Sequence, residues 1–143
     1  MRLALPLLLI CFACGRPAEN AQGNSVKFDQ YFVKGEQVYA QHCSNCHQKS
    51  GAGLGRVFPP LNKSDFVDAH LNEVICLIKH GRKGEIMVNG VMFNQAMPPA
   101  SLTDLEIAEV ATYVYNNWGR KHGIIEVNTV ATYLQQCDSI PGQ

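Results

Sequence analysis

The stretch Cys43-Ser44-Asn45-Cys46-His47 decides how the rest of this 143-residue chain is interpreted. Two cysteines separated by two residues and followed directly by a histidine form the pattern of covalent c-type haem attachment. On one helical turn, the two thiols can each add to a vinyl group of one porphyrin, and the imidazole of His47 can then coordinate the iron. The stretch therefore predicts one covalently bound haem c, held by Cys43 and Cys46, with His47 as an iron ligand.

A C-x-x-C pair has two other common uses, in structural zinc sites and in redox dithiols. A structural zinc site needs four ligands, and the only other downstream cysteines, Cys76 and Cys137, are far from each other in the sequence. A redox dithiol of the thioredoxin type would follow a strand in a βαβ unit, whereas the residues before Cys43 have a helical period. Haem attachment is the interpretation that fits the surrounding sequence.

Length and charge restrict the remaining classes of function. The chain is long enough for one compact domain and little more. Its twelve Lys and Arg residues balance its twelve Asp and Glu residues, so the formal net charge is zero. This balance gives no reason to expect a nucleic-acid partner, and we predict none.

Residues 1–13 have the pattern of a secretory signal peptide, with Arg2 before an apolar run that is too short to span a bilayer. Small residues ahead of Cys14 favour cleavage there, which resembles a bacterial lipoprotein signal, in which the new first cysteine carries lipid. Acyl chains on Cys14 would hold the protein at a membrane surface. The alternative is an ordinary signal peptide that releases a soluble protein. Either way, we expect the protein outside the cytoplasm, in the bacterial periplasm.

Residues 14–28 are polar and lack apolar periodicity, so we expect a flexible tether that leads into a domain of residues 29–119. The domain begins with a helical repeat from about Asp29 to His47. Ser64 can cap a short helix, and the next helix ends at His80-Gly81. The apolar stripe of that helix consists of Leu71, Val74, Ile75 and Ile78.

The second half of the domain shows two further local signals. Asn89-Gly90 lies at the centre of residues 87–92 and predicts the tip of a short hairpin or turn. Thr103 and Glu106 form a capping box at the start of a last helix. Its apolar positions keep helical spacing through Ile107, Val110, Ala111, Val114 and Trp118.

Met97-Pro98-Pro99 lies in a loop that no helix or strand pattern includes, which suits a second iron ligand. A thioether is a soft ligand for reduced iron, and His/Met ligation raises the reduction potential. Met87 and Met92 are rivals that we interpret as residues filling gaps in the core. Three histidines could also ligate iron and are interpreted as solvated side chains, namely His70, His80 and His122.

Taken together, these motifs resemble the class I cytochrome c family over about residues 30–119. The matching stretches are G-E-Q-V-Y-A-Q-H-C-S-N-C-H, F-P-P-L, I-M-V-N-G, M-P-P and D-L-E-I-A-E-V-A-T-Y-V-Y-N-N-W-G. The resemblance implies an all-α fold whose first and last helices cross near Gly35 and Tyr39 around one haem. It also implies that the carbonyl of Pro59 binds the second ring nitrogen of His47 and that Met97 is the distal ligand. Domains of this family occur as free carriers and as modules of nitrite reductases, oxidases and quinoprotein dehydrogenases.

Binding of both His47 and Met97 would leave no open position on the iron, which favours electron transfer over substrate chemistry. We therefore expect a monomeric electron carrier, not an enzyme, that serves a redox donor and a redox acceptor where the catalysis takes place. One alternative is a cytochrome c subunit permanently bound to a terminal oxidase, a nitrite reductase or a quinoprotein dehydrogenase. A second is a haem sensor or peroxidase, which would need an open or labile sixth position.

Two of the six cysteines, Cys76 and Cys137, remain after the signal peptide, the lipid and the haem have taken the others. Cys76 lies opposite the apolar stripe of its helix, so it needs a cover or stands exposed. Residues 120–143 extend past the usual end of the family and contain a short helical pattern that Asn128 could begin. We predict that this extra helix docks there and that the two sulfurs form a disulfide, with two unpaired thiols as the alternative.

Overall fold

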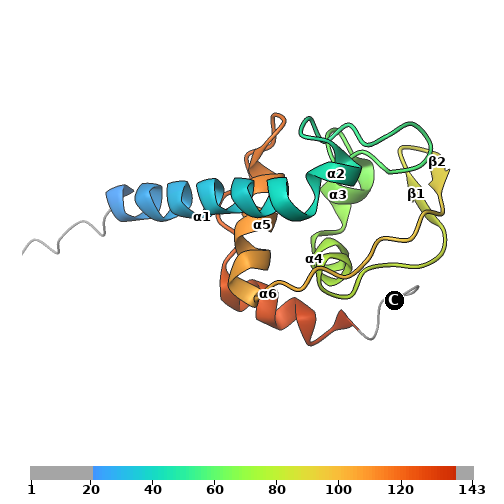
Figure 1. Ribbon diagram of the computed structural model, residues 1–143. Helices are drawn as coiled ribbons and strands as arrows, with labels where there is room; N and C mark the ends of the chain where they lie inside the picture. The colour runs from blue at the N-terminus through green and yellow to red at the C-terminus, as the bar shows by residue number, and fades with distance from the viewer. Residues whose placement is uncertain (1–20, 138–143) are drawn as a thin grey trace, which may run out of the picture.

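Six helices and one two-stranded antiparallel sheet make up the computed structural model, which describes residues 21–137 (Figure 1). The predicted signal peptide, the start of the predicted tether with Cys14, and the last six residues lie outside this range. The elements in order are α1 (Ala21–His42), α2 (Ser44–His47), α3 (Asp65–Ala69), α4 (Leu71–His80), β1 (Ile86–Val88), β2 (Val91–Phe93), α5 (Asp104–Asn116) and α6 (Val127–Leu134).

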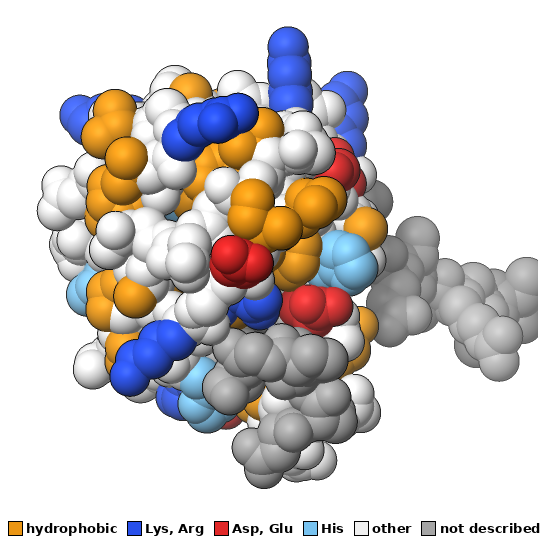
Figure 2. Space-filling view, turned by 90° about the vertical axis from the view of Figure 1, so that its right-hand side faces the viewer, with side chains coloured by type: hydrophobic (Ala, Val, Ile, Leu, Met, Phe, Trp, Pro, Cys, Tyr) orange, Lys and Arg blue, Asp and Glu red, His pale blue; other side chains and the backbone are white. Residues whose placement is uncertain are grey.

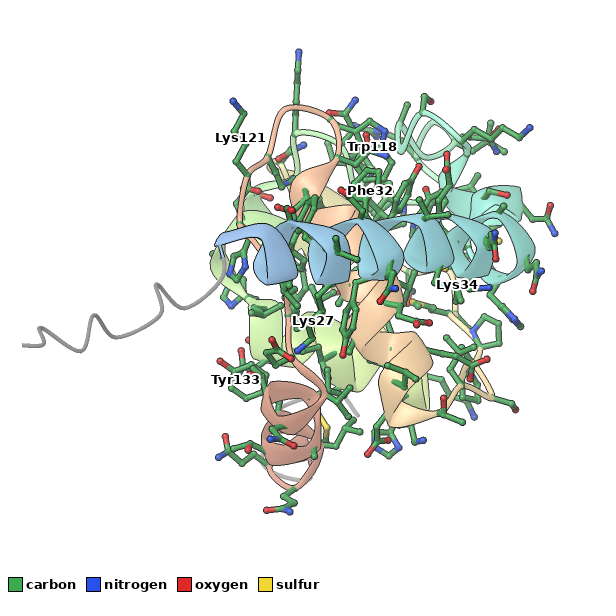
Figure 3. The ribbon with its side chains drawn as sticks, turned by 90° about the vertical axis from the view of Figure 1, so that its left-hand side faces the viewer. Lys27, Phe32, Lys34, Trp118, Lys121 and Tyr133 are labelled. Atoms are coloured by element: carbon green, nitrogen blue, oxygen red, sulfur yellow. A yellow bond between two sulfur atoms is a disulfide. The ribbon has the colours of Figure 1, made fainter. Side chains whose placement is uncertain are left out.

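The crossing of α1 and α5 is the main packing contact of the fold (Figure 3). A β-carbon on Gly35 would lie 2.0 Å from the carbonyl oxygen of Glu109 and 2.8 Å from Cβ of Tyr113, so only glycine allows this approach. Aromatic rings surround the crossing: Tyr113 lies 5.1 Å from Phe32 and 5.3 Å from Tyr39, measured between ring centroids. The predicted helical fold and its crossing at Gly35 and Tyr39 are thus confirmed, with one small hairpin added.

Helix α1 begins at Ala21, within the segment that the sequence analysis assigned to a flexible tether. Two contacts hold the early turns in place. The ammonium of Lys27 donates to both carboxylate oxygens of Glu126, at 2.8 and 2.7 Å, and Phe28 stacks on Phe32 with 5.8 Å between ring centroids. Because Glu126 lies far along the chain, apolar periodicity alone could not indicate this extension.

No helix within residues 21–137 is both long and apolar enough to cross a bilayer.

Helices α3 and α5 begin where their capping residues predict. Val67 donates its backbone N–H to the hydroxyl of Ser64 at 3.2 Å, and this bond caps α3. Both halves of the capping box between Thr103 and Glu106 are present at the start of α5. Behind these caps the core is continuous between α4 and α5, and its fully buried members include Ile75, Ile107, Ala108, Val110 and Ala111.

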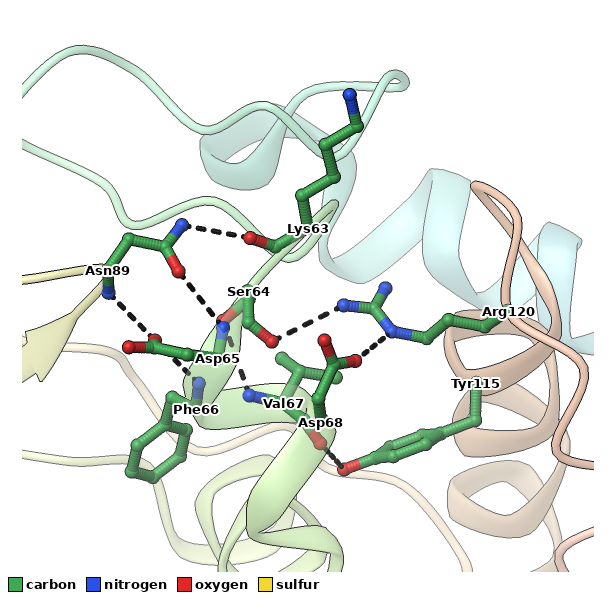
Figure 4. A network of polar contacts seen from close by, with 9 residues as sticks. All are labelled: Lys63, Ser64, Asp65, Phe66, Val67, Asp68, Asn89, Tyr115 and Arg120. Carbon is green, nitrogen blue, oxygen red and sulfur yellow. Dashed lines mark hydrogen bonds and ion pairs between the residues drawn. The ribbon is translucent and has the colours of Figure 1, made fainter.

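The predicted hairpin is present as β1 and β2, with Asn89 and Gly90 at its tip in left-handed conformations. Its tip is fixed to the start of α3: Asn89 donates its backbone N–H to the carboxylate of Asp65 at 2.7 Å, and its amide donates to the carbonyl of Lys63 at 2.9 Å (Figure 4). On the other side of α3, Arg120 pairs with Asp68. The short helix is therefore held between the hairpin and the loop that follows α5.

The side chains of Met87 and Met92 are 57% and 46% exposed, so the interpretation that they fill gaps in the core is wrong. The two residues pair across the hairpin on its outer face, because alternate strand positions direct Val88 and Phe93 inward. Figure 2 shows the face of the molecule that carries the hairpin, where hydrophobic side chains lie exposed beside Lys and Arg side chains.

The predicted disulfide between Cys76 and Cys137 is confirmed, with α-carbons 5.5 Å apart. Both cysteines are buried, because α6 packs against α4 and covers the face of α4 that points away from the apolar stripe. Helix α6 begins at Val127, one residue before the predicted Asn128. Glu126 takes the N-cap position there without a side-chain capping bond, and its carboxylate binds Lys27 instead.

Removing the disulfide in a Cys76→Ala/Cys137→Ala protein should lower the free energy of unfolding by about 4 kcal/mol, because it frees a 61-residue separation in the unfolded chain. Denaturant unfolding followed by far-ultraviolet circular dichroism measures the change. Wild-type protein treated with a thiol reductant under denaturing conditions should lose the same amount. Mass analysis that finds both thiols free in protein isolated without reductant would contradict the assignment.

Candidate functional site

An apolar cavity lies between α2, α4, α5 and the hairpin, and it gathers the residues that the sequence analysis singled out. Cys43, Cys46 and His47 line it from the end of α1 and from α2, and Met97 lines it from the loop before α5. The apolar wall between them includes Phe58, Leu61, Val67, Leu77, Ile78, Val88, Phe93, Val110 and Val114. The fold thus brings both predicted iron ligands to one cavity, although they are far apart in the sequence.

His47 is held in one tautomer by a single hydrogen bond. Its Nδ1 lies 3.0 Å from the carbonyl oxygen of Pro59, and because a carbonyl can only accept, Nδ1 must carry the proton. The lone pair of Nε2 is then available to a metal. Burial lowers the pKa of His47, and the bond to Pro59 opposes this shift only in part. The ring is therefore neutral at neutral pH, and the contact that the family resemblance implied for Pro59 is present.

Left-handed glycines let the loop after His47 fold back beneath its ring. Gly53 has φ of +67°, donates its N–H to the carbonyl of His47 at 3.0 Å, and leaves no room for a β-carbon, which would lie 2.2 Å from the carbonyl oxygen of Phe58. Leu61 donates its N–H to the carbonyl of Gly51 at 2.8 Å and closes the loop. These bonds place Pro59 against His47.

The two cysteines lie on one helical turn. Cys43 accepts backbone hydrogen bonds from Cys46 at 3.2 Å and from His47 at 3.0 Å. Burial, and secondarily the neighbouring Cys46, raises the pKa of the Cys43 thiol to about 11. A thiol with a raised pKa stays protonated at neutral pH. Because the thiolate is the form that attacks disulfides and binds zinc, the raised pKa disfavours both reactions. Within residues 21–137, no three side chains of His, Cys, Asp or Glu are grouped as a metal site would require.

Met97 is fixed by its backbone rather than by its side chain. Arg82 donates its N–H to the carbonyl of Met97 at 2.8 Å, and Met97 donates back to the carbonyl of Arg82 at 2.9 Å. Gly81, at φ +73°, lies directly beneath this bridge, where a β-carbon would be 2.4 Å from the carbonyl oxygen of Met97. The end of α4 thus sets the position of the candidate distal ligand. Sequence reasoning assigned Gly81 to the end of the helix and missed this second role.

The other candidate ligands are elsewhere. Among the described residues that line the cavity, neither the two other methionines nor His70, His80 or His122 is present. His70 pairs through Nδ1 with the carboxylate of Glu73 at 3.0 Å, and the ring of His122 packs edge-on to that of Tyr115. Met97 is therefore the one thioether among the described cavity residues.

The residues of the cavity fit a covalently bound haem c. Two thiols at the required spacing, a neutral imidazole with a defined tautomer, and one thioether meet within walls that are otherwise apolar. When bound there, haem c supplies one-electron redox chemistry at its iron. The protein would contribute the candidate ligands, the orientation of the imidazole and the exclusion of water.

We expect Gly53→Ala to destabilise the protein by about 1–3 kcal/mol and to weaken the bond between His47 and Pro59, because the new β-carbon meets the Phe58 carbonyl in a strained backbone conformation. Exchange of the Nδ1 proton of His47 with water, followed by NMR of the reduced protein, should become faster.

Gly55→Ala is the matched control, since Gly55 also has a positive φ, of +56°, but no atom lies within 4 Å of a β-carbon there. Gly55→Ala should lose stability only through its strained backbone, and the Nδ1 proton of His47 should still exchange slowly with water. Equal proton exchange in both variants would mean that the loop does not set the orientation of the imidazole.

Comparison with known proteins points to one family. The family described as cytochrome C oxidase, cbb3-type, subunit III matches residues 32–114. Cytochrome c-552 of Thermus thermophilus is 34% identical over 96 residues, which cover 59% of this chain and 68% of that protein. The cytochrome c subunit of alcohol dehydrogenase (quinone) of Gluconacetobacter polyoxogenes is 31% identical over 105 residues, or 71% of this chain and 21% of that subunit. The corresponding subunit of Gluconobacter oxydans is 32% identical over 89 residues. This chain thus spans about a fifth of the length of these dehydrogenase subunits.

Proposed function

This chain belongs to the cytochrome c family, and on that basis we propose that it carries single electrons between extracytoplasmic redox partners, with His47 and Met97 as the two axial ligands of its haem c. The observation that carries the proposal is the gathering of both residues, with Cys43 and Cys46, around one apolar cavity. His47 and Met97 come from distant parts of the chain, and binding of both to the iron would leave no open coordination position for a substrate. Catalysis would then belong to the partners, and the protein itself would be a monomeric carrier.

The surroundings of the two ligands suit repeated electron transfer. Hydrogen bonds to the backbone hold each candidate ligand in place. The carbonyl of Pro59 orients the ring of His47, and Arg82 exchanges two backbone hydrogen bonds with Met97. Ligands held in this way need little rearrangement when the charge of the site changes. Apolar walls exclude water, which would otherwise compete with a thioether for the iron. A soft thioether also favours the reduced state and raises the reduction potential.

Replacing the candidate distal ligand tests the proposal. Met97→Ala should abolish the weak red iron–thioether absorption band and open the reduced protein to carbon monoxide at neutral pH. It should also lower the reduction potential on the order of 0.1 V, a fraction of the roughly 0.8 V that axial ligands span. Absorption spectroscopy and potentiometric titration measure these changes.

Met87→Ala and Met92→Ala are the controls, because both side chains are exposed on the outer face of the hairpin. Neither should change the band or the potential. If one of them abolishes the band and Met97→Ala does not, the assignment of Met97 is wrong. Rapid carbon monoxide binding by the wild-type protein would instead favour a sensor or a peroxidase.

A second candidate is a dedicated subunit of a larger oxidoreductase, and the relatives favour considering it. Two of them are cytochrome c subunits of quinone-type alcohol dehydrogenases, and the matching family is described as an oxidase subunit. Such a subunit would have the same haem but a permanent neighbour. Gentle detergent extraction followed by purification separates the two functions, because a free carrier elutes alone and a subunit elutes with its enzyme.

We also propose that lipid on Cys14 tethers the protein to a membrane, on the strength of the apolar run and small residues that precede Cys14. Cys14→Ser should prevent lipidation and, where cleavage still occurs, shift all haem-loaded protein from the membrane to the soluble fraction. Fractionation and intact mass measure this shift. Membrane retention of processed Cys14→Ser protein would exclude a lipid tether at this residue.

A further inference from the structure

Trp118 packs against the loop that follows His47, from outside the haem cavity. A β-carbon on Gly51 would lie 2.6 Å from Cζ2 of Trp118, so the indole ring rests directly on the backbone of Gly51. Trp118 follows the end of α5 and lies past residues 32–114, which match the family. It is the single tryptophan of the chain and is not among the described residues that line the cavity. An effect of Trp118 on the haem site must therefore pass through the loop.

The carbonyl of Gln48 fixes the first turn of this loop. It accepts hydrogen bonds from the hydroxyl of Tyr39 at 2.7 Å and from the N–H of Gly51 at 3.0 Å. Gln48 has a positive φ of 63°, which is uncommon for a residue other than glycine, so the turn needs such bonds to persist. Tyr39 thus connects α1 to the turn by which the chain leaves His47.

The carbonyl of Gly51 fixes the return of the loop. It accepts hydrogen bonds from the N–H groups of Leu61 and Asn62, both at 2.8 Å. Pro59 comes two residues before Leu61, and its carbonyl binds the ring of His47. The orientation of the imidazole therefore depends on a backbone turn that lies beneath an indole ring.

The surroundings of Trp118 hold its ring over this turn. Trp118 has a φ of +51°, a conformation that a bulky residue keeps only where its contacts impose it. Its backbone N–H donates to the side chain of Asn117 at 2.7 Å. Its ring lies edge-on to Tyr39 and Tyr113, at 5.7 and 6.1 Å between ring centroids, on the same side of α1 as Phe32 (Figure 3). The crossing of α1 and α5 thus determines where the indole lies.

We propose that Trp118 is a positioning residue for His47: its ring covers the turn at Gly51, keeps water from the carbonyls there, and so preserves the bond between His47 and Pro59. This inference rests on the proposed function, which takes His47 as an iron ligand. Backbone bonds that are open to water break more often than covered ones, because water competes for their donors and acceptors. Trp118 itself is half-buried, with the loop on its inner side and water on its outer side.

Trp118→Ala removes the ring and keeps a side chain at the same positive φ. In the reduced holoprotein, the Nδ1 proton of His47 should exchange with water about tenfold faster, because opening of the turn releases Pro59. The NMR signal of that proton should also move upfield, since its bond to the Pro59 carbonyl weakens. Trp118→Phe, which restores an aromatic cover, should recover most of both changes.

Phe32→Leu is the matched control, because Phe32 packs on Tyr113 at the same crossing, with 5.1 Å between ring centroids, but lies about two helical turns before Tyr39 on α1. It should lower the free energy of unfolding and leave the exchange and the chemical shift of the His47 proton unchanged. Equal acceleration of exchange in Trp118→Ala and Phe32→Leu, or no acceleration in Trp118→Ala, would overturn the proposal. Absence of reversible one-electron reduction in the wild-type protein would instead refute the carrier function itself.

Hydrogen exchange of the wild-type holoprotein does not depend on how well any variant folds. The amide protons of Leu61 and Asn62 and the Nδ1 proton of His47 should have similar protection, because one opening of the covered loop exposes all three. Release of the indole ring of Trp118, followed by NMR in increasing denaturant, should coincide with this opening. Protection of the His47 proton that persists after the two amides have opened, or after the indole ring has left the loop, would also overturn the proposal.

Discussion

The close crossing of α1 and α5 at Gly35 is the constraint on which the rest of the structure depends. A side chain at Gly35 would overlap the Glu109 carbonyl, so the backbones of the two helices are in direct contact at this point. Helix α1 leads directly into Cys43 and the turn of α2, while Val110 and Val114 on α5 form part of the cavity wall. The distance between the attachment motif and the far wall of the cavity is therefore fixed by one glycine contact well outside the cavity.

Both candidate axial ligands are positioned by the same device, which is a left-handed glycine beside a backbone carbonyl. Gly53 lets the loop after His47 return so that Pro59 accepts from the ring, and Gly81 lets the end of α4 pass close beneath Met97. In each case the backbone of a neighbouring segment, not a flexible side chain, determines where the ligand lies. Such control lowers the freedom of the ligands before any cofactor binds, which suits a site whose ligands must not change with oxidation state.

Local signals predicted much of this fold, because the residues that carry them act on their near neighbours. The attachment motif, the Ser64 cap, the Thr103 capping box and the Asn89-Gly90 tip each lie within a few residues of what they determine. Counting thiols and helical periodicity also predicted the pairing of Cys76 with Cys137 across 61 residues.

The errors and omissions concern long-range contacts. Lys27 extends α1 through Glu126, 99 residues away, and the strand register decided that Met92 faces outward. Arg82 lies between a helix end and a loop, where no periodicity exists to indicate which way its side chain faces. The candidate ligands could therefore be named from the sequence, whereas the presence of Arg82 on the wall of the same cavity became visible only in the fold.

The C-terminal extension supports the site from behind. Residues after 114 lie outside the region that matches the family, yet α6 covers the outer face of α4, whose opposite face presents Leu77 and Ile78 to the cavity. A buried disulfide joins the two helices, and Asn116 holds the intervening loop by exchanging two 2.8 Å hydrogen bonds with Gly123. Disulfides of this structural kind persist in oxidising compartments and are rare in the cytosol. This disulfide therefore supports the proposed extracytoplasmic location independently of the N-terminal residues. The same bond holds α4, which forms one wall of the haem cavity, against the C-terminal extension.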